Sequence, residues 1–256
     1  ASGTWRMSFG ITEPDAGTNT HRVNTTARRT ADGWTLQGAK YWTSAIDEAD
    51  AVLIVARDDE LSTPERSALS LFVVPMIPEN TFFTFYDDVK LSPEALIGEQ
   101  GKGLKQVFVG LNPERIAAAA INNGIARFAL AQAAQYAVDR KVWQVPIGAH
   151  QGVSHPLAES SAPVRGARLL TARAADLFDR REDSAEAANM AKFLAADSSL
   201  KALDQAIQVH GGNGLSYEYG LADLWFVARL HKTAPVSREM VLNHIAQHSL
   251  GLPKSY

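Results

Sequence analysis

The chain has 256 residues, of which 46% are apolar and 21% charged, and its net charge is −3. A chain of this length can bury one large core or two moderate ones. It contains no cysteine, which excludes disulfides, thiolate metal sites and cysteine nucleophiles. Lysines and arginines are scattered, so no nucleic-acid partner is expected, and no apolar run is long enough to span a bilayer.

The first part of the chain has the composition of a β domain. Short segments rich in β-branched and aromatic residues alternate with turn residues. Asp32-Gly33 between two such segments predicts a hairpin. We expect strands within residues 4–12, 21–30, 33–45, 50–59, 68–76 and 81–91. Strands at this spacing favour a barrel or sandwich, so residues 1–98 are expected to form a β-barrel-like domain.

The remaining residues, 99–256, show helical periodicity. A long helix is expected over Glu114–Trp143, with Asn112 as its N-cap and Pro113 at its first position. Ser184 is a plausible N-cap for a later helix, which the glycines of "HGGNG" end. The other helices are expected at about 148–181, 184–209 and 235–249. The predicted fold class is α+β, a barrel-like domain followed by an antiparallel four-helix bundle.

Two stretches of the β domain have residues suited to ligand binding. "ITEPDAGTN" places Thr12, Gly17 and Thr18 in one loop, where backbone N–H and hydroxyl groups can converge on a ligand. The alternative is an ordinary polar turn. "GAKYWTSA" places Trp42 and Ser44 two residues apart, on one face of an expected strand. Trp42 would then cover a flat ligand while Ser44 donates a hydrogen bond, and the alternative is a core Trp beside a solvated Ser.

The helical part offers weaker candidates. The glycines of "VHGGNG", with Gln208 before them, can cap a helix or let the backbone approach a phosphate. Arg140 suits a helix C-terminus or a pyrophosphate. His244 and His248 are four residues apart, but no third ligand is near in the sequence, so no metal site is expected.

Taken together and in this order, these stretches resemble the acyl-CoA dehydrogenase family. "ITEPDAGTN" is similar to the family's Thr-Glu-Pro-x-Ala-Gly-Ser-Asp segment, and "GAKYWTSA" to its Gly-x-Lys-x-Trp-Ile-Thr-Asn strand. "YDDVKLSPEALIGEQGKG" resembles the exit from the family's β domain. "DRKVW" followed by "HQ", and "IQVHGGNGLSYEY", resemble its two later segments. The likeness covers almost the whole chain.

The resemblance implies FAD-dependent dehydrogenation of an acyl-CoA to the trans-2-enoyl-CoA in fatty acid metabolism. Electrons would pass to an electron-transferring flavoprotein, and the protein would be a homo- or hetero-oligomer, a dimer or tetramer. The implied compartment is the cytoplasm, or the mitochondrial matrix in a eukaryote. The residues that would bind FAD are Phe9, Ile11, Thr12, Gly17, Thr18, Trp42 and Ser44, and, across a subunit interface, Arg140, Gln151, Gln208, Gly211 and Gly212.

The catalytic base departs from the commonest family pattern. Most members carry a Glu in a Tyr-Glu-Gly-Thr segment before the last helix, where this chain has Ala234 or Pro235. A minority place it before an Arg at the start of the long helix, and "NPERIAAAA" matches them. The resemblance therefore implies Glu114 as base and Arg115 as a substrate-binding residue. The alternative is that Glu114 is only a first-turn acid favoured by the helix dipole.

A second departure from the family pattern concerns the helical domain that family members carry before the β domain. This chain begins almost at the β domain, so we expect either a fragment or a wall of the acyl pocket supplied by another polypeptide. Two other functions remain open. One is a flavin monooxygenase or nitroalkane-oxidase-like enzyme on the same fold, and the other is a non-catalytic subunit.

Overall fold

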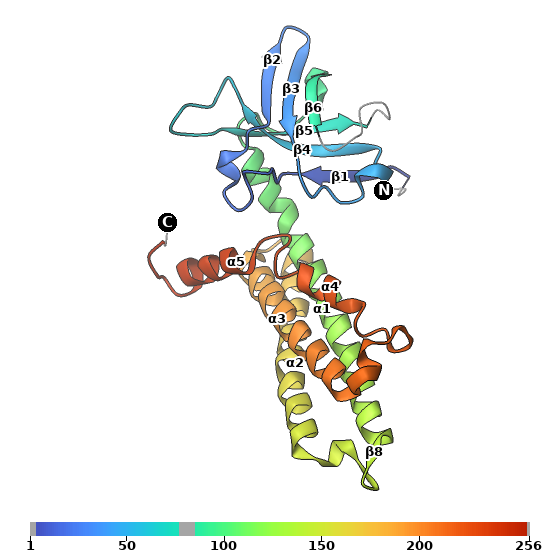
Figure 1. Cartoon of the computed structure of the whole chain (residues 1–256). Helices are drawn as coiled ribbons and strands as arrows, with labels where there is room; N and C mark the ends of the chain where they lie inside the picture. Colours follow the sequence, from blue (N-terminus) through green and yellow to red (C-terminus); the bar gives the residue numbers. More distant parts are fainter. Residues whose placement is uncertain (1–3, 77–84, 255–256) are drawn as a thin grey trace. The chain divides into compact units, whose positions relative to one another are not determined.

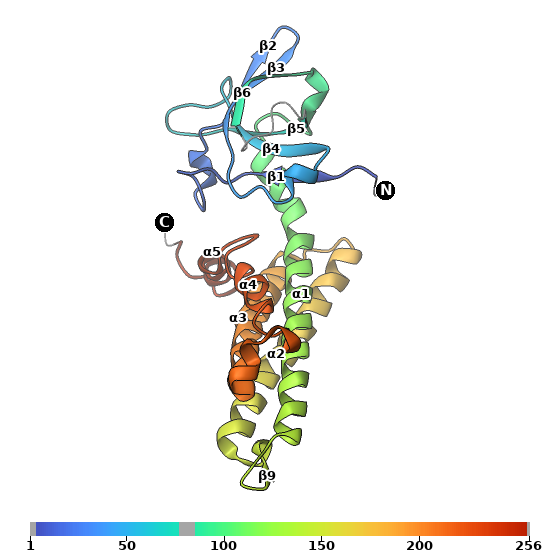
Figure 2. The same ribbon diagram turned by 45° about the vertical axis from the view of Figure 1, so that its right-hand side comes forward.

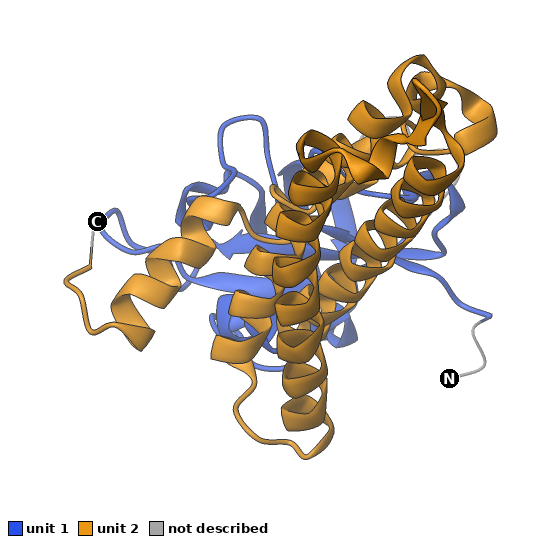
Figure 3. Ribbon diagram, turned by 90° about the horizontal axis from the view of Figure 1, so that it is seen from below, with its two compact units in different colours: residues 1–109 blue, residues 110–256 orange. Residues whose placement is uncertain are grey.

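A computed structural model of the protein describes residues 4–76 and 85–254. The chain divides into two compact units, residues 1–109 and residues 110–256, coloured blue and orange in Figure 3. Part of the strand expected over residues 81–91 lies outside the described residues. Among the described helices, none has both the length and the hydropathy that a bilayer-spanning segment needs.

The first unit is built on one mixed sheet (Figure 1). Its strands run in the order β6-β3-β2-β4-β5-β7, and β1 lies parallel to β4. The strands are β1 Met7–Gly10, β2 Thr26–Thr30, β3 Gly33–Ala39, β4 Ala51–Asp58, β5 Leu69–Pro75, β6 Phe85–Leu91 and β7 Leu96–Ile97. Each segment expected to contain a strand does contain one, and the two-residue β7 was not predicted.

The described strands form an open mixed sheet, so the expected barrel-like closure is not confirmed. Along one edge of β4, the parallel partner β2 is paired only at Arg57 and Asp58. The other part of β4, Ala51–Ile54, pairs with β1 instead. A barrel needs its first and last strands to pair, and no pairing joins β6 to β7 among the described strands.

The core of this unit lies where β3, β4 and β5 pack their apolar side chains. Trp34 and Phe72 are fully buried and meet edge to face, with ring centroids 5.1 Å apart. The predicted hairpin is confirmed, because β2 and β3 pair from Thr30 opposite Gly33. Gly33 has φ +143°, and a Cβ there would lie 2.1 Å from the Leu91 carbonyl oxygen, so only glycine fits.

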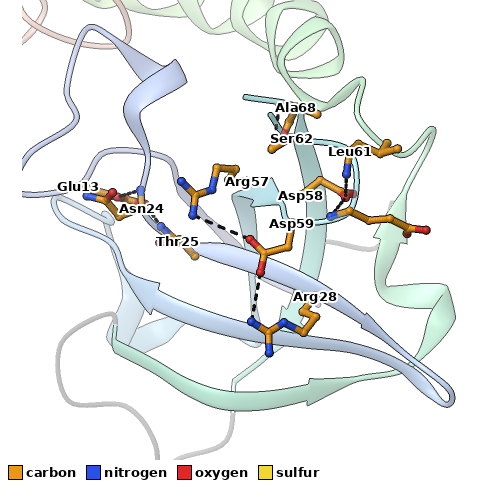
Figure 4. Close-up of polar contacts among 11 residues, drawn as sticks. Glu13, Asn24, Thr25, Arg28, Arg57, Asp58, Asp59, Leu61, Ser62 and Ala68 are labelled. Carbon is orange, nitrogen blue, oxygen red and sulfur yellow. Dashed lines mark hydrogen bonds and ion pairs between the residues drawn. The ribbon is translucent and has the colours of Figure 1, made fainter. Parts of the chain in front are cut away.

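A buried ion pair fixes the loop after β1 to the end of β3. Glu13 and Lys40 are both almost completely buried, and Lys40 Nζ lies 2.7 Å from Glu13 Oε1. The backbone N–H groups of Asn24 and Thr25 also donate to the Glu13 carboxylate (Figure 4). Lys40 Nζ donates a further hydrogen bond to the Ile11 carbonyl. Both charges therefore have the hydrogen-bond partners that a buried pair requires.

The two charges of this pair respond to burial differently. Burial alone would raise the pKa of Glu13, but the hydrogen bonds from Lys40, Thr25 and Asn24 outweigh it and lower the pKa. Burial lowers the pKa of Lys40, and Glu13 only partly offsets this. The carboxylate is thus held in its charged form, and the pair contributes to stability as long as Glu13 stays ionised.

The second unit consists mainly of three long helices that lie side by side (Figure 2). Its contacts are made by small residues: Ala126 of α1, Val164 of α2 and Ala202 of α3 form one buried cluster. The helices are α1 Gly103–Asp139, α2 Gln151–Asp179, α3 Ala185–His210, α4 Leu224–Leu230 and α5 Arg238–His244, with a π-helical segment at Ile245–Ser249. The helix expected at about 235–249 is present, because α5 continues directly into the π-helical segment and the two cover residues 238–249. The seven-residue α4 was not predicted, and the described residues do not confirm a four-helix bundle.

The predicted start of the long helix is wrong. The helix α1 begins at Gly103, and Pro113 lies inside it. Leu104, Val107 and Leu111 have helical spacing, and Val107 is buried, so the helix gains stability from residues before the proline. Proline removes only one backbone hydrogen bond, which a long packed helix can tolerate.

The boundaries of α3 agree with the sequence. Ser184 is its N-cap residue, although its hydroxyl makes no capping bond. Gly211 ends the helix with φ +59°, a positive φ that glycine adopts without strain.

A buried lysine ties α3 to the segment that precedes α5. Lys192 is 1% exposed, and its ammonium donates a 2.5 Å hydrogen bond to the Val236 carbonyl. Asp197, one turn further along α3, forms ion pairs of 2.9 Å with both Lys232 and Arg238. Burial lowers the pKa of Lys192 to about 8, and the nearby Arg115 charge adds to this effect. The helix therefore holds this segment through one buried ammonium and one bridging carboxylate.

We predict that Glu13→Gln destabilises the protein by about 3–5 kcal/mol at neutral pH, because it leaves the buried Lys40 ammonium without its counter-charge. The Glu13 pKa is lower in the folded protein than in the unfolded chain. The difference from wild type should therefore shrink as the pH falls through the carboxylate range. Urea unfolding of both proteins at several pH values measures this difference in the free energy of unfolding. Adding Lys40→Met should restore much of the loss, and a double variant as unstable as the single one would contradict the account.

We predict that Lys192 makes stability depend on pH at the alkaline end. In the unfolded chain this lysine keeps its proton up to an ordinary pKa of 10.5, whereas the folded protein loses it at about 8. Wild type should therefore gain stability relative to Lys192→Met as the pH rises from 8 to 10.5. The measurement is chemical unfolding of both proteins across this range, with Lys201→Met, an exposed lysine of the same helix, as charge control. A difference that stays constant would contradict the prediction.

Candidate functional site

The two candidate ligand-binding stretches of the β domain lie next to each other in the structure. The Tyr41 N–H donates a 2.7 Å hydrogen bond to the Thr12 carbonyl. The Ser8 hydroxyl donates a 2.8 Å bond to the Ser44 carbonyl. The first stretch follows β1 directly and the second lies at the end of β3. The Tyr41–Thr12 backbone hydrogen bond joins the two stretches, and the Ser8 hydroxyl ties the second one to β1. This adjacency supports a shared site and was not predictable from either stretch alone.

The expected placement of Trp42 and Ser44 on one strand face is wrong. The strand β3 ends at Ala39, and Trp42 has φ +58°, which is incompatible with extended backbone. The two residues lie in the connection between β3 and β4, and both are exposed. Trp42 is 86% exposed, so it is not the core residue that the alternative interpretation required. Its indole is free to cover a flat ligand.

The loop after β1 has open space beside its glycine. A Cβ added at Gly17 would have no other atom within 4 Å, and its backbone does not require glycine. Packing therefore does not explain this glycine, whereas close approach of a ligand to the backbone does. Thr18 is exposed beside it, Thr12 is half-buried, and the two apolar candidates of β1 and its exit, Phe9 and Ile11, are half-buried as well. These residues fit a flavin cofactor.

The second group of candidates gathers at one end of the helical unit. Arg140 directly follows α1, and Gln151 begins α2 after a short hairpin, in which the Ile147 N–H donates to the Arg140 carbonyl. The rings of Tyr136 and His210 are 4.2 Å apart, which brings the end of α3 beside the end of α1. Arg140, Gln151, Gln208, Gly211 and Gly212 are all exposed there. Gly212 resembles Gly17, because an added Cβ would meet no atom within 4 Å.

The candidate base lies far from this end of α1. With a rise of 1.5 Å per residue, Glu114 and Arg140 are separated by about 39 Å along the helix. Since α1 begins at Gly103, Glu114 lies in the helix interior, so its interpretation as a first-turn acid is wrong. Glu114 keeps contact with solvent, and the surrounding protein atoms raise its pKa by desolvation, while the Arg115 charge lowers it by less.

Arg115 carries a buried positive charge next to the candidate base. It is 4% exposed, and one terminal nitrogen donates a 2.9 Å hydrogen bond to Asn112 Oδ1. Its Nε has no hydrogen-bond partner within the described part of the chain. A buried guanidinium with an unused donor is costly, so this atom is suited to a polar group of a ligand.

The segment before α5 contains no carboxylate at the position where most family members carry the base. Ala234 and Pro235 stand there, and Lys192 and Asp197 hold the flanking residues as described above. Glu239, the next acid along the chain, is exposed on α5.

The residues that support the site are not evident from the sequence alone. Glu13 and Lys40 belong to the two quoted stretches, but only the structure brings their charges together. A signal was available, because each is a single charged residue directly after an apolar strand segment. His244 and His248 have ring centroids 4.5 Å apart, and the described residues contain no group of three side chains suited to a metal ion.

Comparison with known proteins gives a consistent result. The family model "Acyl-CoA dehydrogenase, middle domain" matches residues 8–90, and "Acyl-CoA dehydrogenase, C-terminal domain" matches residues 101–250. The acyl-CoA dehydrogenase FadE12 of Mycobacterium tuberculosis is 50% identical over 273 residues, which cover all of this chain and 70% of FadE12.

Two solved structures are similar in fold and sequence. The glutaryl-coenzyme A dehydrogenase in complex with glutaryl-CoA superposes with a TM-score of 0.87 and 31% identity, over 97% of this chain and 67% of that one. The electron transferring flavoprotein of Acidaminococcus fermentans gives a TM-score of 0.90 and 27% identity, over 98% and 70%. The chain therefore belongs to the acyl-CoA dehydrogenase family, whose members are FAD-containing oxidoreductases of fatty acid metabolism.

Proposed function

We propose that the protein oxidises an acyl-CoA thioester to the trans-2-enoyl-CoA, with Glu114 as the base that removes the α proton. The observation that carries this proposal is the pair Glu114–Arg115 in the interior of α1. A carboxylate with a raised pKa and access to solvent stands there beside a buried guanidinium with an unused donor. A general base works best when its pKa approaches the operating pH.

The cofactor proposed for this reaction is FAD, held by the β domain of residues 1–98. Thr12 would bond the edge of the flavin ring, against the apolar Phe9 and Ile11, and Gly17 and Thr18 would approach the pyrophosphate. The open space beside Gly17 supports this assignment. Trp42 would cover the ring, with Ser44 beside it, and the exposed indole supports this role. When bound, FAD supplies an acceptor for the hydride that leaves the substrate Cβ.

The chain's own groups in the helical domain, residues 99–256, would prepare the substrate. The Glu114 carboxylate takes the proton from Cα. Arg115 is proposed to orient the thioester end through its unused Nε, while Asn112 keeps the guanidinium in place. The Arg115 charge offsets only part of the rise in the Glu114 pKa that burial causes. The Glu114 carboxylate therefore remains a stronger base than an ordinary glutamate.

We further propose that the protein acts as an oligomer. Arg140, Gln151, Gln208, Gly211 and Gly212 lie at one end of the helical unit, about 39 Å along α1 from Glu114. A single FAD cannot contact both the base region and this end of the same chain. The separation supports the assignment of these five residues to the FAD of a second subunit. The proposed electron acceptor is an electron-transferring flavoprotein.

We predict that Glu114→Gln lowers the rate of flavin reduction by acyl-CoA by about 10²–10⁴-fold, because it removes the proton acceptor. FAD content should stay the same, since Glu114 is not among the residues proposed to hold it. In wild type the rate should fall as the pH drops through the raised pKa of Glu114. Anaerobic stopped-flow absorbance at several pH values measures both effects.

The matched control is Glu239→Gln, which removes the exposed acid of α5. Acyl-CoA should reduce the flavin of this variant at close to the wild-type rate. Loss of reduction in Glu239→Gln together with normal reduction in Glu114→Gln would assign the base to Glu239 instead. Normal reduction in both variants would contradict catalysis by either carboxylate.

A further inference from the structure

A groove between α1 and α2 contains none of the candidate cofactor, base or substrate residues. It is an open surface hollow of about 550 Å³, lined by Gly124, Arg127, Phe128, Leu130 and Ala131 of α1 and by Ser161, Val164, Arg165 and Arg168 of α2. The spacing of three and four residues places each set on one face of its helix. Arg127 lies thirteen positions from both Glu114 and Arg140, so the groove is roughly 20 Å along α1 from each.

Three arginines line this groove and no acidic residue does. Arg127, Arg165 and Arg168 are exposed, and none forms an ion pair or hydrogen bond with another described residue. The next arginines along the chain are paired: Arg173 of α2 and Arg180, which directly follows α2, both bind Asp176, at 3.1 and 2.9 Å. The groove is therefore the place on these helices where positive charge collects without a counter-charge.

Unneutralised guanidinium groups around one hollow create a strong local potential. Like charges repel each other, so a cluster of unpaired positive charges attracts anions. Guanidinium binds phosphate oxygens through two parallel hydrogen bonds, which makes a cluster of arginines better suited to phosphate than to a single carboxylate. The chemistry of the groove thus favours an anion with several oxygen atoms.

The size and lining of the groove point to more than a bare anion. Its volume lies within the range of about 300–1,000 Å³ typical of small-molecule sites. Small residues leave its floor open, and a Cβ added at Gly124 would meet no atom within 4 Å. Phe128 is 41% exposed beside the arginines and offers an aromatic face on which a flat ring can stack.

We infer that this groove binds an organic phosphate of nucleotide size. The phosphates contact Arg127, Arg165 and Arg168, and a ring lies against Phe128. This site is independent of the proposed dehydrogenation, because its residues are not those proposed to hold FAD, base or substrate.

The test is calorimetric titration of FAD-saturated protein with ADP and, separately, with pyrophosphate. We expect both to bind, with an affinity that falls as salt concentration rises. The triple variant Arg127→Gln, Arg165→Gln, Arg168→Gln should bind both at least tenfold more weakly. Phe128→Ala should weaken the binding of ADP by several-fold and leave the affinity for pyrophosphate unchanged. This difference separates ring stacking from phosphate binding.

Arg173→Gln is the control, because it removes one positive charge from α2 outside the groove. It should bind ADP as wild type does. Absence of ADP and pyrophosphate binding in wild type, or equal binding in the triple variant, would overturn the inference. A triple variant that changes its association state while wild type binds neither probe would assign the arginines to contacts between protein chains instead. Flavin reduction by acyl-CoA, measured on the same samples, reports on the proposed function separately.

Discussion

The buried ion pair between Glu13 and Lys40 is the constraint on which the candidate cofactor site depends. It joins the loop after β1 to the end of β3, and the strands themselves do not make this connection. Two charges removed from water are stable only when their hydrogen bonds are complete, and here backbone N–H groups and a carbonyl complete them. The Lys40 side chain also packs over Gly10, where an added Cβ would lie 3.2 Å from Lys40 Cγ. The pair therefore fixes where Thr12, Gly17 and Trp42 are displayed.

In the helical unit, the length of α1 determines how far apart the candidate functional groups lie. The small residues of α1, α2 and α3 allow these helices to pack closely. The candidate functional groups lie far apart along the single long helix α1. Glu114 and Arg115 stand near one end, and Arg140 stands at the other. This arrangement suits a protein in which two chains complete each cofactor site. It also leaves the middle of α1 free to form the arginine-lined groove with α2.

Sequence patterns predicted the elements better than their ends and contacts. Six of the seven strands in the first unit's sheet and the ends of α3 follow from alternation, Asp32-Gly33 and the paired glycines, because these signals are local. The start of α1 was misplaced, since a proline after a plausible cap is a strong local signal, and packing around Val107 overrode it. Trp42 was misplaced on a strand because nothing local reveals its positive φ. The Glu13–Lys40 and Lys192–Val236 contacts join residues far apart in sequence, so only the folded chain shows them.

The most direct test of the proposed function is an anaerobic titration of the FAD-loaded protein with a panel of acyl-CoA thioesters. The visible flavin band is followed, and the product is analysed. We expect at least one thioester to bleach the band and to yield a trans-2-enoyl-CoA in equal amount. An unchanged band across the panel, with FAD still bound, would contradict dehydrogenation by this chain. Rapid reoxidation of the reduced flavin by air with a hydroxylated product would instead assign the protein to monooxygenase chemistry.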